Sequence, residues 1–252
     1  MLARRCAGAR PAALALLPLA LLMLALLITG CGEDEPSGDK SADGGSQDKA
    51  PAPGEGAGSG EQAAPGGCKQ VETPKPKPDG GERKPARRLD RDKRYEVVVQ
   101  TSCGSFTIRL DQATSPATAA SFAALAEKGF FDGTVFHRIV PGFVIQGGDP
   151  TASGMGGPGY STRDQPPADA AYTKGVVAMA KGPQEAFGTA GSQFYVVTGE
   201  DAGLEPQYAI LGKVTAGLDV AERIGELGDP ASGSAGTPLQ TVVIEQATLR
   251  TG

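Results

Sequence analysis

The order of apolar and polar residues beyond residue 94 is mainly that of short β-strands. Residues 105–110 alternate polar and apolar side chains, and residues 95–101 are rich in β-branched residues, so we predict a hairpin that turns at Cys103 and Gly104. Further runs of strand character occupy residues 135–140, 143–146, 175–179, 193–197, 208–214 and 241–248. We therefore expect eight short strands in this part of the chain.

Two segments have the periodicity of helices instead. Ser115 and Pro116 form a helix start signal, apolar residues follow at helical spacing, and Gly129 ends the pattern. A second helix is predicted near residues 218–227. Many short strands with two helices and no alternation of strand and helix favour a mainly β fold, a closed barrel, over a parallel α/β sheet.

The composition changes sharply at the start of the first predicted strand. All 8 Phe and 5 Tyr lie at or after Tyr95, whereas residues 32–94 hold 12 Gly and 8 Pro and no aromatic residue. Such a segment cannot bury enough apolar surface to offset its chain entropy. We therefore expect residues 31–94 to form a disordered tether rich in Gly, Pro and charge, and residues 95–252 to form a single globular domain.

The N-terminus has the pattern of an export signal. Three arginines within the first ten residues precede an apolar run, 12–28, that is short for a membrane-spanning helix. The sequence ITGC at 28–31 resembles the bacterial lipobox, which predicts removal of residues 1–30 and a lipid on Cys31 that anchors the protein at the outer face of the bacterial cell membrane. The alternatives are an ordinary cleaved signal or an uncleaved anchor in which Cys31 is incidental.

Export determines which of the four cysteines are available to form a disulfide. Once Cys6 is removed with the signal and Cys31 is lipidated, Cys68 and Cys103 are the two thiols left, and disulfides persist in exported proteins. We predict that Cys68 and Cys103 pair. The chain has no CxxC motif, so a zinc ribbon or a thioredoxin-like redox site is excluded.

Charge and histidine content exclude further classes. Residues 95–252 hold 9 basic and 16 acidic side chains, and this net charge of −7 argues against nucleic-acid binding, for which a basic face is expected. The chain has one histidine, His137. A metal site would therefore need cysteines or carboxylates for most of its ligands. We expect neither a metal nor a cofactor.

The densest group of candidate functional residues lies in FHRIVPGFVIQGGD, residues 136–149. A Pro-Gly turn separates two strand segments, which would bring together Arg138, Phe143 and Gln146. A second strand, within GSQFYVVT at 191–198, places Gln193 and Tyr195 on one face through its period of two.

These two motifs resemble the signature strands of the cyclophilin family of peptidyl-prolyl cis-trans isomerases. Further similarity lies in SPATAASF, GVVAMA and LGKVTAGLDV, so the resemblance covers nearly all of residues 95–252. It implies a closed eight-stranded antiparallel barrel capped by two helices. It also implies a groove on the outside of the barrel for proline-containing polypeptides.

The resemblance also assigns roles to individual residues. It makes Arg138 the catalytic residue, supported by Phe143 and Gln146. Its implied substrate-binding residues are His137, Ala180, Gln193, Tyr195, Leu204 and Tyr208. Tyr195 replaces the commoner Phe, and its hydroxyl must find water or a hydrogen-bond partner. Gly203 stands where the family often has Trp, so we expect weak cyclosporin binding.

The resulting hypothesis is a monomeric, lipid-anchored isomerase that assists the folding of exported proteins. A scaffold or holdase that binds proline-containing peptides with little turnover is the main alternative.

A thiol protease using Cys103 and His137 is not favoured, because no third residue that would orient the histidine is evident. Residues 181–190 form an insertion between two groove strands, and their role stays open.

Overall fold

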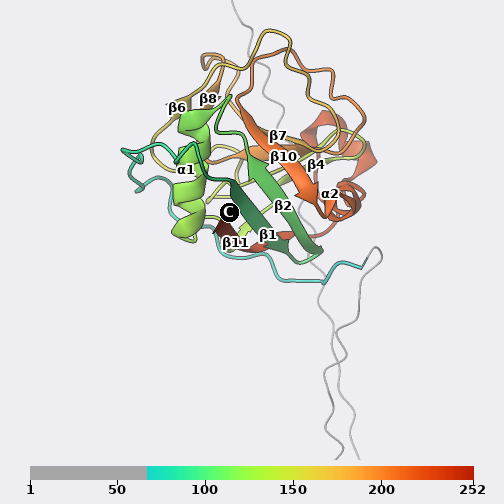
Figure 1. The fold of residues 1–252 in the computed structure, drawn as a ribbon. Coiled ribbons are helices and arrows are strands. Elements are labelled where there is room, and N and C mark those ends of the chain that lie inside the picture. Colours follow the sequence, from blue (N-terminus) through green and yellow to red (C-terminus); the bar gives the residue numbers. More distant parts are fainter. Residues whose placement is uncertain (1–66) are drawn as a thin grey trace, which may run out of the picture. The chain divides into compact units, whose positions relative to one another are not determined.

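The computed structural model describes residues 67–252, which form an antiparallel sheet flanked by helices (Figure 1). The strands are β1 (Tyr95–Thr101), β2 (Gly104–Leu110), β3 (Thr134–Val135), β4 (Arg138–Val140), β5 (Val144–Gly147), β6 (Thr162–Arg163), β7 (Val176–Met179), β8 (Thr189–Ala190), β9 (Phe194–Val197), β10 (Ile210–Ala216) and β11 (Val243–Thr251). The helices are α1 (Pro116–Glu127), α2 (Leu218–Gly225) and the short 3-10 helix η1 (Pro230–Ala235). The expected mainly β fold is confirmed.

The main sheet has nine strands in the order β3-β11-β1-β2-β10-β7-β9-β5-β4, all paired antiparallel. Its outermost strands, β3 and β4, do not pair with each other, and near this opening a single bridge joins Val135 to Asp149. The sheet is therefore a strongly curved, open barrel. The expectation of a closed eight-stranded barrel was wrong.

The ninth strand arises because the expected strand 135–140 divides in two. The amide of Phe136 donates to the carbonyl oxygen of Val242, beside β11, whereas the amide of Ile139 donates to Gly236. The chain thus changes hydrogen-bonding partners between β3 and β4. An additional two-stranded sheet of β6 and β8, which the apolar pattern did not indicate, lies beside α1.

Two apolar clusters lie on opposite faces of β5, β7 and β9. One is the main core, which holds Phe194 and Val196 of β9 and in which Phe194 contacts Phe122 and Phe131 edge-on. The other is a smaller cluster built on Tyr195 and Val197 of the same strand. Since alternate residues of a strand point to opposite faces, these strands are buried on both sides, and the smaller cluster supports the candidate site.

The two α-helices lie on opposite sides of the strands (Figure 1). In α1, Pro116 stands in the first turn, where its missing N–H costs no hydrogen bond, and Phe122 and Leu125 enter the core. In α2, Val220 and Ile224 lie four residues apart and are buried on one face. Both helices follow the sequence prediction.

Residues 67–94, which we call the N-terminal arm, lie against the domain instead of forming a tether. Backbone hydrogen bonds join Lys69 to Ser102, Gly80 to Gly157 and Glu82 to Pro158. Figure 1 shows the arm, in blue-green, running past β1 and β11 and then beside α1. The expected domain boundary at residue 95 is therefore too late, because polar and backbone hydrogen bonds replace the missing aromatic core contacts.

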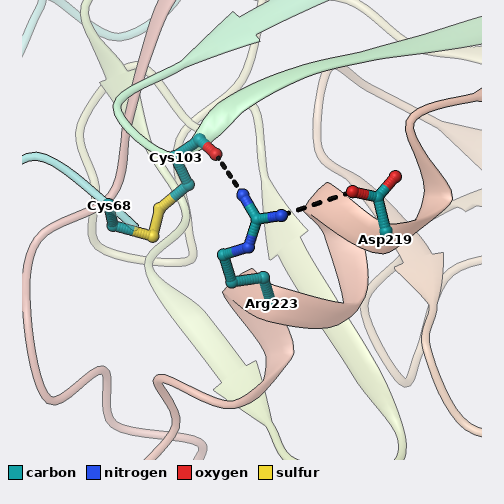
Figure 2. Close-up of polar contacts among 4 residues, drawn as sticks. All are labelled: Cys68, Cys103, Asp219 and Arg223. Atoms are coloured by element: carbon teal, nitrogen blue, oxygen red, sulfur yellow. Dashed lines mark hydrogen bonds and ion pairs between the residues drawn. A yellow bond between two sulfur atoms is a disulfide. The ribbon is translucent and has the colours of Figure 1, made fainter. Parts of the chain in front are cut away.

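A disulfide fastens the beginning of the arm. Cys68 and Cys103 are bonded, as the sequence led us to expect, and both are buried. Figure 2 shows Arg223 of α2 bracing the same turn: its guanidinium donates to the carbonyl oxygen of Cys103 (3.1 Å) and pairs with Asp219 (3.3 Å). The β1–β2 turn is thus tied to both the arm and α2.

The proposed signal peptide, residues 1–30, and the lipidation site Cys31 lie outside the described residues. The same holds for residues 32–66 of the expected tether. Within residues 67–252, no helix combines the length and the apolar character needed to cross a membrane.

Candidate active site

The candidate site is built on a row of residues that lie directly opposite one another across four strands. Arg138 of β4 pairs with Gln146 of β5, Gln146 pairs with Tyr195 of β9, and Tyr195 pairs with Ala178 of β7. Directly opposite residues point to the same face of a sheet and lie within contact distance. The register therefore brings together residues that are 57 positions apart in the chain, from Arg138 to Tyr195.

A pocket of about 290 Å³ opens over this row. Seven of the nine residues assigned to catalysis or substrate binding line it: Arg138, Phe143, Gln146, Ala180, Tyr195, Leu204 and Tyr208. The lining also includes Val144 and Lys181, which the motif comparison did not single out. The pocket has an apolar floor, a cationic donor at one side and an amide beside it.

Arg138 is held in place at three points. Its Nε donates to the carbonyl oxygen of Ser234 (3.0 Å), its Nη1 donates to Oε1 of Gln146 (3.3 Å), and its guanidinium carbon lies 5.8 Å from the ring centre of Phe143. Burial lowers the pKa of Arg138, and Tyr208 acts in the opposite direction. A guanidinium nonetheless stays charged in proteins, so Arg138 presents a positioned cationic donor.

A chain of amides continues from Arg138 away from the pocket. Nε2 of Gln146 donates to Oε1 of Gln193 (3.0 Å), and Nε2 of Gln193 donates to the carbonyl oxygen of Gly156 (2.9 Å). Gln193 therefore lines the adjoining pocket and not the one that holds Arg138. Its position links the site to the glycine-rich loop at residues 154–159.

Tyr195 and Tyr208 form an aromatic side of the pocket, and the ring of Tyr172 contacts both of them. The ring of Tyr195 lies edge-on to that of Tyr208, and the hydroxyl of Tyr172 both donates to the carbonyl oxygen of Tyr208 and accepts from its amide. The hydroxyl of Tyr195 is buried and has no hydrogen-bond partner in the described part of the chain. Burial, reinforced by the other two tyrosines, raises its pKa. The partner that this hydroxyl was expected to need is not supplied by the described residues.

A second pocket of about 550 Å³ adjoins the first and shares Gln146, Ala180 and Lys181 with it. One wall is the glycine-rich loop, whose amides at Gly154 and Gly156 donate to Asp149. The backbone amides of Gly154 and Gly156 therefore already bind a carboxylate of the protein itself.

His137 and Cys103 do not form a catalytic pair. His137 lines neither pocket, both of its ring nitrogens are buried without hydrogen-bond partners within residues 67–252, and burial lowers its pKa. Cys103 is consumed by the disulfide. Among residues 67–252 no group of three or more His, Cys, Asp or Glu side chains is arranged to hold a metal ion.

Two positioning residues were not identified from the sequence. Asp149 ends the motif FHRIVPGFVIQGGD, and its carboxylate organises the glycine-rich loop through Thr151, Gly154 and Gly156. Asp79 was assigned to the tether, yet it lines the second pocket. The motif Asp-x-Thr at 149–151 is a local turn signal that would have indicated the first, whereas no local signal marks the second.

The arrangement suits a peptide that lies across both pockets. The apolar floor fits a compact ring, the guanidinium can donate to a nitrogen or carbonyl of that ring's peptide bond, and the amides offer donors and acceptors to the backbone. It contains no free nucleophile aligned with a base. Chemistry by hydrogen bonding without a covalent intermediate fits these groups best.

Comparison with known proteins agrees with this geometry. A family model described as cyclophilin type peptidyl-prolyl cis-trans isomerase/CLD matches residues 96–249. The chain is 39% identical over 135 residues to peptidyl-prolyl cis-trans isomerase-like 1 of Aspergillus oryzae, a match that covers 52% of this chain and 81% of that protein. It is 37% identical over 151 residues to peptidyl-prolyl cis-trans isomerase ppi1 of Schizosaccharomyces pombe, covering 58% and 95%.

A solved structure shares the fold. The crystal structure of a Cryptosporidium parvum cyclophilin type peptidyl-prolyl cis-trans isomerase, determined in the presence of the dipeptide Ala-Pro, superposes with a TM-score of 0.55 at 28% sequence identity. The superposition covers 62% of this chain and 98% of that one.

Proposed function

The chain belongs to the cyclophilin family and is a cyclophilin-type peptidyl-prolyl cis-trans isomerase, and we propose that Arg138 catalyses the isomerisation by donating a hydrogen bond to the prolyl nitrogen. The observation that carries this proposal is the guanidinium itself, held beside the pocket by Ser234 and Gln146. A side chain restrained in this way loses little freedom when it binds the substrate.

The reaction needs only a weakening of amide resonance. Resonance keeps the bond before proline planar with a barrier of about 18–20 kcal/mol. A donor that binds the prolyl nitrogen favours its pyramidal form and withdraws its lone pair from conjugation, so the bond rotates more easily. Arg138 supplies this donor while Phe143 and Tyr195 hold the pyrrolidine ring.

The substrate is a proline-containing polypeptide whose backbone lies along the groove. Gln146 borders both pockets, so its amide is placed to hold the chain on one side of the prolyl bond while the other side turns. No covalent intermediate forms in this scheme. The groove is open, which suits segments of an unfolded chain as well as short peptides.

The test compares the purified full-length parent with Arg138→Ala on Ala-Pro peptides, with exchange between cis and trans forms followed by NMR. We expect the parent to accelerate exchange and the variant to lose at least tenfold of that acceleration while still binding the peptide. Binding without acceleration by the parent would instead favour the alternative, a scaffold or holdase that recognises proline-containing segments.

We further propose that the protein acts outside the cytoplasm, anchored to the bacterial cell membrane by a lipid on Cys31, where it assists the folding of exported proteins. The buried Cys68–Cys103 disulfide supports this placement, because such bonds persist in oxidising compartments. Proline isomerisation is slow enough to limit folding, so chains that fold after export benefit from catalysis.

Metabolic labelling with a fatty-acid analogue tests the anchor. The parent should incorporate label and fractionate with membranes, and Cys31→Ala should do neither. Label retained by Cys31→Ala would contradict the anchor without affecting the isomerase assay.

A further inference from the structure

The binding groove extends past the pocket for the prolyl ring, and this inference rests on the function proposed above. The second pocket shares Gln146, Ala180 and Lys181 with the first. A peptide that places its proline in the first pocket therefore places a nearby residue in the second. The walls of the second pocket decide which side chains are accepted there.

Two parts of the chain complete these walls beside the glycine-rich loop. The insertion at residues 181–190 contributes Lys181 and Glu185, and the N-terminal arm contributes Asp79. These three are the only charged residues among the described residues that line the pocket. The remaining lining residues are uncharged, and six of them are glycines, so the arm and the insertion determine the charge of the pocket.

The arm is built into the wall by specific contacts. The amide of Gly157 donates to Oδ1 of Asp79 (2.8 Å), and the amide of Gly80 donates back to the carbonyl oxygen of Gly157 (2.9 Å). The backbones cross closely here, since a Cβ at Gly159 would lie 3.0 Å from Cα of Gly80. Asp79 is thus positioned by the loop that it faces.

Contacts on both sides of Asp79 hold the arm in this position. The ammonium of Lys77 donates to the carbonyl oxygens of Phe130 (2.6 Å) and Asp132 (3.0 Å), just beyond the end of α1. After Asp79, the ammonium of Lys84 donates to the carbonyl oxygen of Ser161 (3.0 Å). The disulfide at Cys68 secures the beginning of the arm, so the carboxylate is a fixed part of the groove.

The charges in the pocket are unbalanced. The ammonium of Lys181 donates to the carbonyl oxygens of Gly182 and Glu185, both at 3.1 Å, and also lies 5.7 Å from the ring centre of Tyr208. Asp79 and Glu185 each use one carboxylate oxygen to accept from a backbone amide. The pocket therefore holds two carboxylates and one ammonium, and the ammonium already donates to carbonyl oxygens of the protein. Each carboxylate keeps one oxygen without a hydrogen bond to the described residues.

The pocket also has an apolar side. The side chain of Met155, at the tip of the glycine-rich loop, is 88% exposed and belongs to the pocket lining. Lysine and arginine bury an aliphatic stem against apolar surface while the charged head meets polar groups. An apolar surface next to two carboxylates is therefore complementary to the aliphatic stem and the cationic head of a Lys or Arg side chain.

We propose that the N-terminal arm is part of the substrate-binding site, and that Asp79, together with Glu185, selects substrates that carry Lys or Arg near the prolyl residue. The arm lies outside the segment that the family model matches, so this selection is a property of the longer chain. Both carboxylates are exposed, and the preference they confer is modest.

The experiment measures kcat/KM on peptides in which Lys, Glu or Ala occupies, in turn, each of the three positions on either side of Pro. For the full-length parent we expect Lys to exceed Glu about fivefold at one position, the one that reaches the second pocket. Asp79→Asn and Glu185→Gln keep the acceptors for the backbone amides. Each should reduce this ratio, and the double variant should bring it close to one.

Glu245→Gln is the matched control, because it removes the same charge from an exposed site on β11 that does not line the pocket. It should leave the ratio unchanged, and added salt should lower the ratio only in proteins that retain Asp79 or Glu185. An unchanged ratio in the double variant, an equal effect of Glu245→Gln, or loss of activity on the Ala peptides in Asp79→Asn would overturn the proposal. A parent inactive on every peptide would instead contradict the isomerase function itself.

Discussion

Arg138 lies directly opposite Gln146 in the β4–β5 ladder, and its guanidinium donates a hydrogen bond to the amide oxygen of that glutamine at 3.3 Å. Gln146 in turn donates a hydrogen bond to Gln193, and Gln193 donates one to the carbonyl oxygen of Gly156 in the glycine-rich loop. Arg138 and the wall of the second pocket are therefore connected through two amide side chains.

This connection predicts coupled effects of substitution. Arg138→Ala should lower kcat/KM at least tenfold, equivalent to about 1.4 kcal/mol of transition-state stabilisation. Gln146→Ala should lower it about three- to tenfold, because Arg138 keeps its bond to Ser234 but loses the second point of support. The double variant should lose less than the product of the two factors.

The matched control is Gln246→Ala, an exposed glutamine of β11 outside both pockets. Steady-state kinetics on Ala-Pro peptides measure all four variants. Strictly multiplicative losses would show that Arg138 and Gln146 act independently.

The tyrosine hydroxyls predict opposite effects on stability. Tyr195→Phe removes a buried hydroxyl that has no hydrogen-bond partner among residues 67–252, so the free energy of unfolding should rise by about 1 kcal/mol. Tyr172→Phe removes a hydroxyl that makes two hydrogen bonds to the backbone of Tyr208, so the free energy of unfolding should fall by about 1–3 kcal/mol. Urea denaturation followed by circular dichroism measures both, and equal changes in the two variants would contradict the assignment.

The disulfide predicts a large stability effect. Cys68 and Cys103 close a loop with a sequence separation of 35, which the chain-entropy model makes worth roughly 3–4 kcal/mol. The variant with both cysteines replaced by alanine should lose stability of that order in urea. Reductant should destabilise the parent toward the same value and leave the variant unchanged, and sensitivity of the variant to reductant would point to another cause.

Asp149 predicts how stability changes with pH. Burial disfavours its carboxylate, but hydrogen bonds from Thr151, Gly154 and Gly156 outweigh burial and lower its pKa. A carboxylate whose pKa is lowered by folding stabilises the protein above the unfolded value of about 3.9, and this contribution is lost as the pH falls further.

Asp149→Asn should therefore lower the free energy of unfolding at neutral pH by about 1–3 kcal/mol, since one acceptor is replaced by a donor facing backbone amides. The difference from the parent should shrink as the pH falls below about 4. Asp169→Asn, at an exposed aspartate, is the control and should change little at any pH. A constant difference across the pH range would contradict the role of the charge.

Much of the fold followed from local patterns. The period-two alternation in β2 and the start signal at Ser115 and Pro116 located these elements to within one or two residues. The strand predicted at 135–140 was only partly right, because its apolar residues are continuous while its hydrogen-bonding partner changes at Phe136. Local patterns cannot show a change of partner.

The chain's own residues determined that a β-rich domain forms beyond residue 94 and that Arg138, Phe143 and Gln146 meet across a turn. The pairing of Cys68 with Cys103 followed instead from the small number of cysteines and the expectation of export. Periodicity, turn chemistry and motif spacing involve only a few neighbouring residues, so they can be recognised in the sequence alone. Tertiary structure alone decided that the sheet stays open, that the Tyr195 hydroxyl has no hydrogen-bond partner among the described residues and that Asp79 reaches the groove. These features depend on contacts between residues far apart in the chain, such as Asp79 and Gly157, whose free energies are set by three-dimensional packing and leave no local pattern.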